Sequence, residues 1–177
     1  MFHQHHLTAC ILTTTAVLAL IGCAQAPVVP DHAPPGLRTS LVPTAEWERV
    51  TRPGFGAPPG FSFLLPPGFE RFDLQPIDSD AATYVRGEAE LHYDFGPYSG
   101  RPTATGGDVI EQQIRIGGRG ARVVAYTRAD GRQVVAAWWE NVSRGPIGRN
   151  HLLIRAEFPS PADRDELLAS IYSVEWE

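Results

Sequence analysis

Asp130-Gly131, which stands between two apolar runs, constrains the fold of this chain more than any other pair of residues. An Asp-Gly pair in this setting is a strong signal for a β-hairpin. A two-residue loop would place Val123 opposite Trp138 and Arg122 opposite Trp139. A three-residue loop, with Gly131 in the left-handed region, would shift that register by one residue. In either register both faces carry Val, Ala and Trp, so we expect the hairpin to be central in a sheet and covered on both sides.

Short segments rich in β-branched and aromatic residues surround this hairpin, with Gly, Pro or Asp at their joints. Such segments predict strands, at about 61–65, 69–75, 82–86, 89–95, 109–116, 120–128, 132–142 and 151–158. After them, Ser160 as N-cap, Pro161 at the first position and Asp163 predict a helix with an apolar stripe. Val174 and Trp176 alternate with glutamates and suggest a short closing strand. The sequence therefore predicts an α+β fold, mainly an antiparallel sheet with a C-terminal helix packed on one face.

The amino-terminal part of the chain has the pattern of an export signal. The apolar run from Leu7 to Gly22 is shorter than the ~20 residues of a membrane span and suits the core of a signal peptide. Leu20-Ile21-Gly22-Cys23 resembles the lipobox of bacterial lipoproteins. That resemblance implies a diacylglycerol on the sulfur of Cys23, cleavage after Gly22 and acylation of the new amino terminus. Residues 1–6 contain no Lys or Arg, and a secretory signal cut near Ala24 or Ala26 is the alternative.

The cysteines and prolines fit a lipid anchor. Cys10 would be removed with residues 1–22, which leaves Cys23 as the single thiol, unable to form an internal disulfide. Ala24 after the cysteine resembles the outer-membrane destination, so we expect the protein on the periplasmic face of the outer membrane, held by its acyl chains. We predict a lipidated, Pro-rich disordered tether over 23–45 and a single α+β domain over 46–177.

The charge excludes two classes of partner. The formal net charge is −5, and all 15 basic residues are arginines. A mildly acidic domain with scattered arginines has no electrostatic footprint for nucleic acid or anionic lipid. Attachment to a membrane would therefore depend on the acyl chains at Cys23.

Two further resemblances concern the domain. An Ile-Asp-Ser turn at 77–79 and the segment 91–99, which ends in Asp94-Phe95-Gly96-Pro97-Tyr98-Ser99, resemble a pattern of small uncharacterised bacterial envelope proteins. In that pattern a Tyr stands where this chain has Phe95, and the resemblance implies no activity. The order of hairpin, strand, helix and closing strand also resembles the topology of PsbP- and Mog1-type proteins, which are accessory or binding factors.

One candidate for chemistry is a row of polar side chains on the strand predicted at 89–95. Alternation places Glu90, His92 and Asp94 on one face, with Glu88 beside them. Such a row can bind a metal or transfer protons, or it can be the solvent face of a strand whose other face is apolar. The two interpretations differ in whether the side chains enter a concave pocket or line an open sheet. We favour the solvent face and expect neither a metal nor another cofactor.

Candidates for recognition lie on the hairpin and on the loop 96–108. Trp138-Trp139 places one indole on each side of the sheet. We take Trp139, beside Arg122, as the candidate ligand or partner surface, together with Tyr98 in the Gly- and Pro-rich loop. Between such a surface and packing of both indoles in the core, we favour packing in the core.

Together these features predict a lipid-anchored cell-envelope protein that acts as a non-catalytic binding or accessory module, with an envelope protein as a possible partner. One alternative is a small hydrolase or metal-dependent enzyme that uses His92 and its carboxylates. Another is a structural envelope-assembly factor that makes contact through the loop 96–108.

Overall fold

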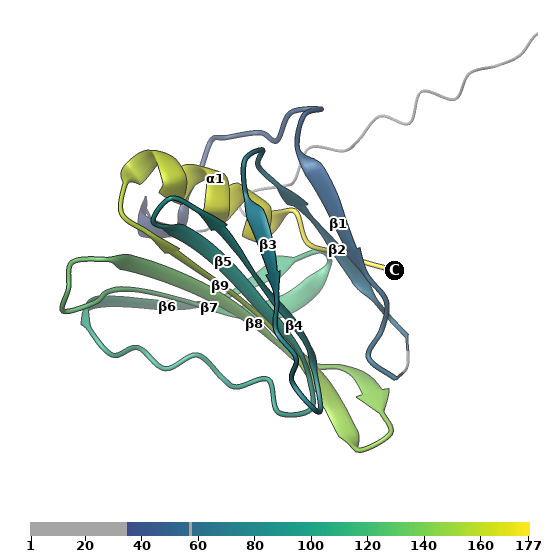
Figure 1. The fold of residues 1–177 in the computed structure, drawn as a ribbon. Coiled ribbons are helices and arrows are strands. Elements are labelled where there is room, and N and C mark those ends of the chain that lie inside the picture. Colours follow the sequence, from purple (N-terminus) through teal and green to yellow (C-terminus); the bar gives the residue numbers. More distant parts are fainter. Residues whose placement is uncertain (1–34, 57) are drawn as a thin grey trace, which may run out of the picture.

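Ten β-strands, a 3-10 turn and one α-helix follow one another in residues 35–56 and 58–177, the part of the chain that the computed structural model describes (Figure 1). They are η1 (Pro35–Leu37), β1 (Glu48–Arg52), β2 (Phe61–Leu65), β3 (Glu70–Asp73), β4 (Asp80–Arg86), β5 (Ala89–Gly96), β6 (Gly107–Ile116), β7 (Arg119–Thr127), β8 (Gln133–Gly145), β9 (Gly148–Phe158), α1 (Pro161–Tyr172) and β10 (Glu175–Trp176).

The strands divide between two antiparallel sheets. Seven form the larger sheet in the order β3-β4-β5-β9-β8-β7-β6, and three form the smaller sheet in the order β1-β2-β10. Helix α1 contacts β9 of the larger sheet and β2 of the smaller one. The predicted α+β class, mainly antiparallel sheet with a C-terminal helix packed on it, is confirmed. Alternation along the sequence assigns faces to a strand, but it does not reveal which of the two sheets the strand joins.

The hairpin at Asp130-Gly131 has the three-residue loop. Gly131 has φ 84°, in the left-handed region, and its N–H donates to the carbonyl of Arg128 at 3.0 Å. The register accordingly places Arg122 opposite Trp138, one residue away from the pairing of a two-residue loop. As expected, β7 and β8 lie inside the larger sheet. One face of the hairpin contributes to the main core, and the other packs Val124, Tyr126 and Val134 against Ala104.

The two sheets pack through aromatic side chains. Phe61 on β2 meets Tyr93 and Phe95 on β5 edge-on, with ring centroids 5.5 and 5.4 Å apart. Phe63 meets Tyr84 on β4 in the same way at 5.9 Å. Edge-to-face contacts between rings are directional, so they favour one relative orientation of the two sheets in addition to the gain from burial. The smaller sheet is therefore seated on the inner face of the larger one, with β2 against β4 and β5.

Helix α1 begins as the sequence predicts. The Ser160 hydroxyl accepts a hydrogen bond from the Asp163 N–H at 3.2 Å and Pro161 opens the helix. The apolar stripe of Leu167, Leu168 and Ile171 is buried. The helix lies beside the smaller sheet, on the same side of the larger sheet (Figure 1).

Residues 36–39 are held against α1, although we expected them within a disordered tether. Leu37 is fully buried, and the Tyr172 hydroxyl donates to its carbonyl. Arg164 donates to the carbonyl of Gly36 at 2.7 Å, and the Thr39 hydroxyl donates to that of Asp165 at 3.2 Å. Packed structure therefore extends to residues before 46. The signal, Cys23 and the rest of the predicted tether lie outside the described residues, and within these no helix is long and apolar enough to span a bilayer.

Candidate functional site

A groove opens between the two sheets where β1 lies beside β3 and β4. Its volume is about 370 Å³, and it is lined by Glu48, Arg49, Val50, Thr51, Leu65, Phe69, Arg71 and Tyr84. β1 and β3 are each the last strand of their sheet, so within residues 35–56 and 58–177 each has one edge without a neighbouring strand. The groove therefore runs along two edges that belong to different sheets.

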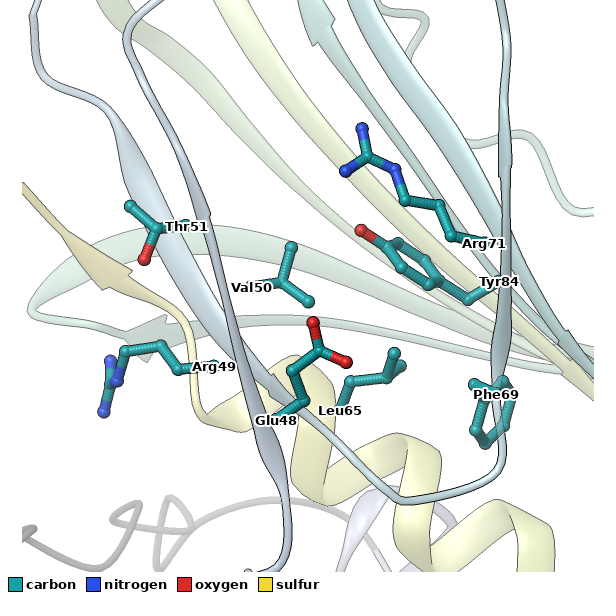
Figure 2. Close-up of a pocket in the computed structure, with 8 residues that line it drawn as sticks. All are labelled: Glu48, Arg49, Val50, Thr51, Leu65, Phe69, Arg71 and Tyr84. Atoms are coloured by element: carbon teal, nitrogen blue, oxygen red, sulfur yellow. The ribbon is translucent and has the colours of Figure 1, made fainter.

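Alternation on β1 decides which side chains enter the groove. Glu48 and Val50 project toward β3 and β4, whereas Arg49 and Thr51 point away (Figure 2). Arg71 of β3 and Tyr84 of β4 approach from the other side. They share one face because Arg71 and Tyr84 are directly paired across the ladder. The groove thus brings together side chains that are far apart in the sequence.

The groove has an apolar floor and a charged rim. Val50, Leu65 and Tyr84 are buried, and Phe69 is half-buried. Glu48 and Arg71 are exposed and carry opposite charges on opposite sides. A ligand with one apolar group and flanking polar groups matches this arrangement, because small sites combine an apolar surface with few oriented polar groups.

Burial reinforces the neutral state of the Tyr84 hydroxyl. Burial is the main cause that raises the pKa of Tyr84, and the nearby charges of Arg71 and Arg52 oppose the rise in part. The hydroxyl therefore stays protonated at neutral pH, where it serves as a hydrogen-bonding group. A protonated phenol can both donate and accept a hydrogen bond at this position.

An ion pair beside the groove fixes the distance between the two sheets. Arg52 of β1 donates two hydrogen bonds to Asp80 of β4, at 2.8 and 2.6 Å, and the Tyr93 hydroxyl donates to Asp80 at 3.2 Å. The hydrogen bond to Asp80 raises the pKa of Arg52, although burial opposes it. Bidentate pairs of this kind restrain orientation as well as distance. Next to the groove, this ion pair therefore links β1 of the smaller sheet to β4 of the larger one.

The predicted surface at Trp139 is wrong. Trp139 is fully buried on the inner face of β8, where its ring packs edge-on against Trp176 at 5.9 Å. The three-residue loop places Arg122 on the opposite face, next to Trp138. Trp139 therefore belongs to the core, and the two residues do not form one surface.

The outer face holds Trp138 and Arg122 under the segment that follows β5. Trp138 stacks on His151 at 5.4 Å and Arg101 lies over its ring at 5.5 Å. Arg122 binds Glu111 at 2.5 and 2.7 Å and donates to the carbonyl of Pro102 at 3.2 Å. Tyr98 is 69 % exposed on the same segment. Of the three predicted surface residues, only Tyr98 has the accessibility that a contact surface requires.

Glu90, His92 and Asp94 line the outer face of the larger sheet, away from the groove. The His92 Nδ1 lies 3.2 Å from the Thr83 hydroxyl. Burial lowers the pKa of His92, while Asp94 and Glu90 oppose the change. All three side chains are half-buried rather than exposed, so the outer face is partly covered at this row. Within the described residues no group of three or more His, Cys, Asp or Glu is placed to hold a metal ion.

Comparisons with protein-family models, with curated proteins and with solved structures each found no match for this chain.

Sequence reasoning did not find the groove. Glu48, Arg71 and Tyr84 come from β1, β3 and β4, and no local motif links them. The sequence does place charged pairs on short strands, at Glu48-Arg49 and Glu70-Arg71. Charged residues are common on edge strands because they prevent aggregation, so these pairs do not by themselves indicate a binding site. Only the packing of one sheet on the other brings these side chains together.

Proposed function

We propose that this chain is a lipid-anchored cell-envelope protein whose domain is a non-catalytic accessory module that binds a segment of another envelope protein. The observation that carries the binding role is the groove between β1 and β3, with its apolar floor and its opposed charges at Glu48 and Arg71. An extended polypeptide segment suits this place, because a polypeptide offers apolar side chains, charges and main-chain groups for a free strand edge.

The proposed attachment depends on Cys23 and on the Pro-rich segment after it. A Cys directly behind an apolar run explains why an exported chain would keep a single thiol. Two or more acyl chains hold a protein firmly to a bilayer, whereas one chain gives marginal binding. The net charge of −5 favours attachment by lipid over attachment by a basic surface.

The anchor is tested by fractionation of cells that express the full chain. We expect the wild type in the membrane fraction and the Cys23→Ala variant in the soluble fraction. Cys10→Ala is the matched control, since it removes the other cysteine, and it should stay membrane-bound. Membrane association of Cys23→Ala at the wild-type level would refute lipidation at this position.

The groove is tested by photo-crosslinking in intact envelopes. A photoreactive benzoylphenylalanine in place of Phe69, which lines the groove, should give an adduct with one envelope protein. The same group in place of Tyr98, an exposed aromatic outside the groove, should give none. Adducts from the Tyr98 position alone would instead support contact through the loop 96–108.

Charge reversal then separates groove binding from chance proximity. Glu48→Arg should remove the adduct formed at position 69, because it places two positive charges on opposite sides of the groove. Glu140→Arg reverses another exposed glutamate, on β8, and should leave the adduct unchanged. Equal adduct yields from both variants would contradict the proposed role of the groove.

A further inference from the structure

Strand β3 exposes apolar side chains at a sheet edge that pairs with no other strand among the residues that the structure describes. It is the terminal strand of the larger sheet, and all four of its residues are exposed. Phe72 is 53 % exposed and Leu74, directly after the strand, is 46 % exposed. An edge strand with exposed apolar residues is a template for pairing with another strand.

The hydrogen bonds of β3 show which main-chain groups face the open side. The N–H of Leu74 donates to the carbonyl of Ala81 at 3.3 Å, toward β4. In an antiparallel ladder, alternate residues direct their main-chain groups to the same neighbour. Phe72 therefore bonds toward β4 as well, and the N–H and C=O groups of Arg71 and Asp73 face the open edge.

We propose that two copies of this chain pair at this edge, β3 against β3, with Phe72 opposite Phe72 of the second copy. A twofold axis perpendicular to the sheet keeps each face of the sheet continuous, so opposed residues must share a face. In this register Arg71 stands opposite Asp73 of the second copy, and Asp73 stands opposite its Arg71. These are the residues whose main-chain groups are open, so each such pair exchanges two hydrogen bonds.

The charges select this register over its neighbours. Opposite charges that face each other across strands stabilise a pairing, and like charges destabilise it. A shift of the second copy by two residues would place Arg71 opposite Arg71. The register centred on Phe72 instead joins two Arg–Asp pairs on one face and two aromatic rings on the other. Within one copy, Arg71 of β3 forms an ion pair with Asp73 of the same strand at 2.6 Å. The two side chains therefore lie on the same face of β3, where each would stand opposite its oppositely charged counterpart in the second copy.

The pairing changes the groove. Arg71 lines the groove, and Asp73 of the second copy would stand beside it at the rim. The twofold axis leaves both inner faces on the same side of the extended sheet, so the two grooves adjoin.

A four-residue strand buries less area than the 1,200–2,000 Å² or so of a stable interface, so we expect a weak dimer. This inference does not depend on what the groove binds.

Disulfide trapping tests the pairing directly. Residues opposed in the centre of this register have Cα atoms about 4.5 Å apart, within the range that a disulfide bridges. In membranes from cells that express the full chain, Phe72→Cys should give a disulfide-linked species of twice the monomer mass after mild oxidation. Val109→Cys is the matched control, because Val109 is 50 % exposed on β6, the opposite edge of the same sheet.

The dimer yield from Phe72→Cys should exceed the yields from Val109→Cys and from the wild-type cysteines at least tenfold. Adding Arg71→Asp, which opposes like charges at both pairs, should reduce it about tenfold. Adding Arg71→Asp together with Asp73→Arg restores opposite charges and should restore the yield. Equal trapping at positions 72 and 109, a disulfide adduct with a different protein, or no recovery in the charge swap would each overturn the proposal.

Discussion

Leu37→Ala should destabilise the domain strongly, although the residue lies in a segment whose composition predicts a tether. Leu37 is fully buried in the main core, next to Tyr172 of α1. Truncating a buried leucine to alanine costs about 2–5 kcal/mol, since it removes the transfer free energy and leaves a cavity. For a domain of this size about 3 °C is lost per kcal/mol. We therefore expect the melting temperature to fall by about 6–15 °C.

The measurement is thermal unfolding followed by circular dichroism, with urea unfolding as a second probe. Leu41→Ala is the matched control, because it is the same substitution in the same segment at a side chain that is 36 % exposed. It should change the free energy of unfolding by about 0.5 kcal/mol or less. If the two variants unfold together, residues 36–39 do not belong to the cooperative core and the reasoning fails.

Three further results are expected. Gly131→Ala should lower the free energy of unfolding, measured in urea, by about 1–2 kcal/mol. The added Cβ would touch no other atom, so the cost comes from the φ of 84°, which residues with a Cβ disfavour. Gly120→Ala, with equal space and no such φ, should be neutral. Ser160→Ala should cost about 1 kcal/mol through the lost N-cap, and an unchanged urea midpoint would contradict that assignment. Burial, opposed by the charge of Arg164, raises the pKa of Tyr172 to about 12. Below pH 10 Tyr172 is protonated in both the folded and the unfolded chain, so the stability is unaffected there. As the pH rises from 10 to 12, the unfolded chain loses this proton first, and the free energy of unfolding falls by about 2 kcal/mol. Tyr172→Phe should flatten that part of the pH profile.

The larger part of the fold could be predicted from local patterns. Alternation predicts β2 at 61–65 and β5 at 89–95 almost residue for residue, because strands with one buried face repeat every two residues. Ser160 and Pro161 similarly predict the start of α1. The hairpin register could not be decided, since both loop lengths satisfy the same pattern of apolar residues. The structure decides it at Gly131.

What could not be predicted depends on contacts between distant segments. Leu37 follows two prolines and a glycine, and its burial is visible only when α1 lies beside it. The residues next to Trp138 and Trp139 in the sequence do not decide which of the two indoles lies beside Arg122. That depends on the hairpin register, which differs by one residue between the two loop lengths. For the same reason the groove has no local signal, because Glu48 and Tyr84 meet only through the packing of two sheets.

The attachment of Leu37 to α1 has a consequence for how far the domain can travel. Under the proposed lipidation, about 14 residues separate the acylated Cys23 from this fixed point. Fully extended, such a stretch covers at most about 50 Å. The domain would then contact only molecules that lie close to the surface of its membrane. Lengthening the stretch with glycine and serine would enlarge the set of neighbours that it touches, whereas deleting part of it would press α1 toward the lipid.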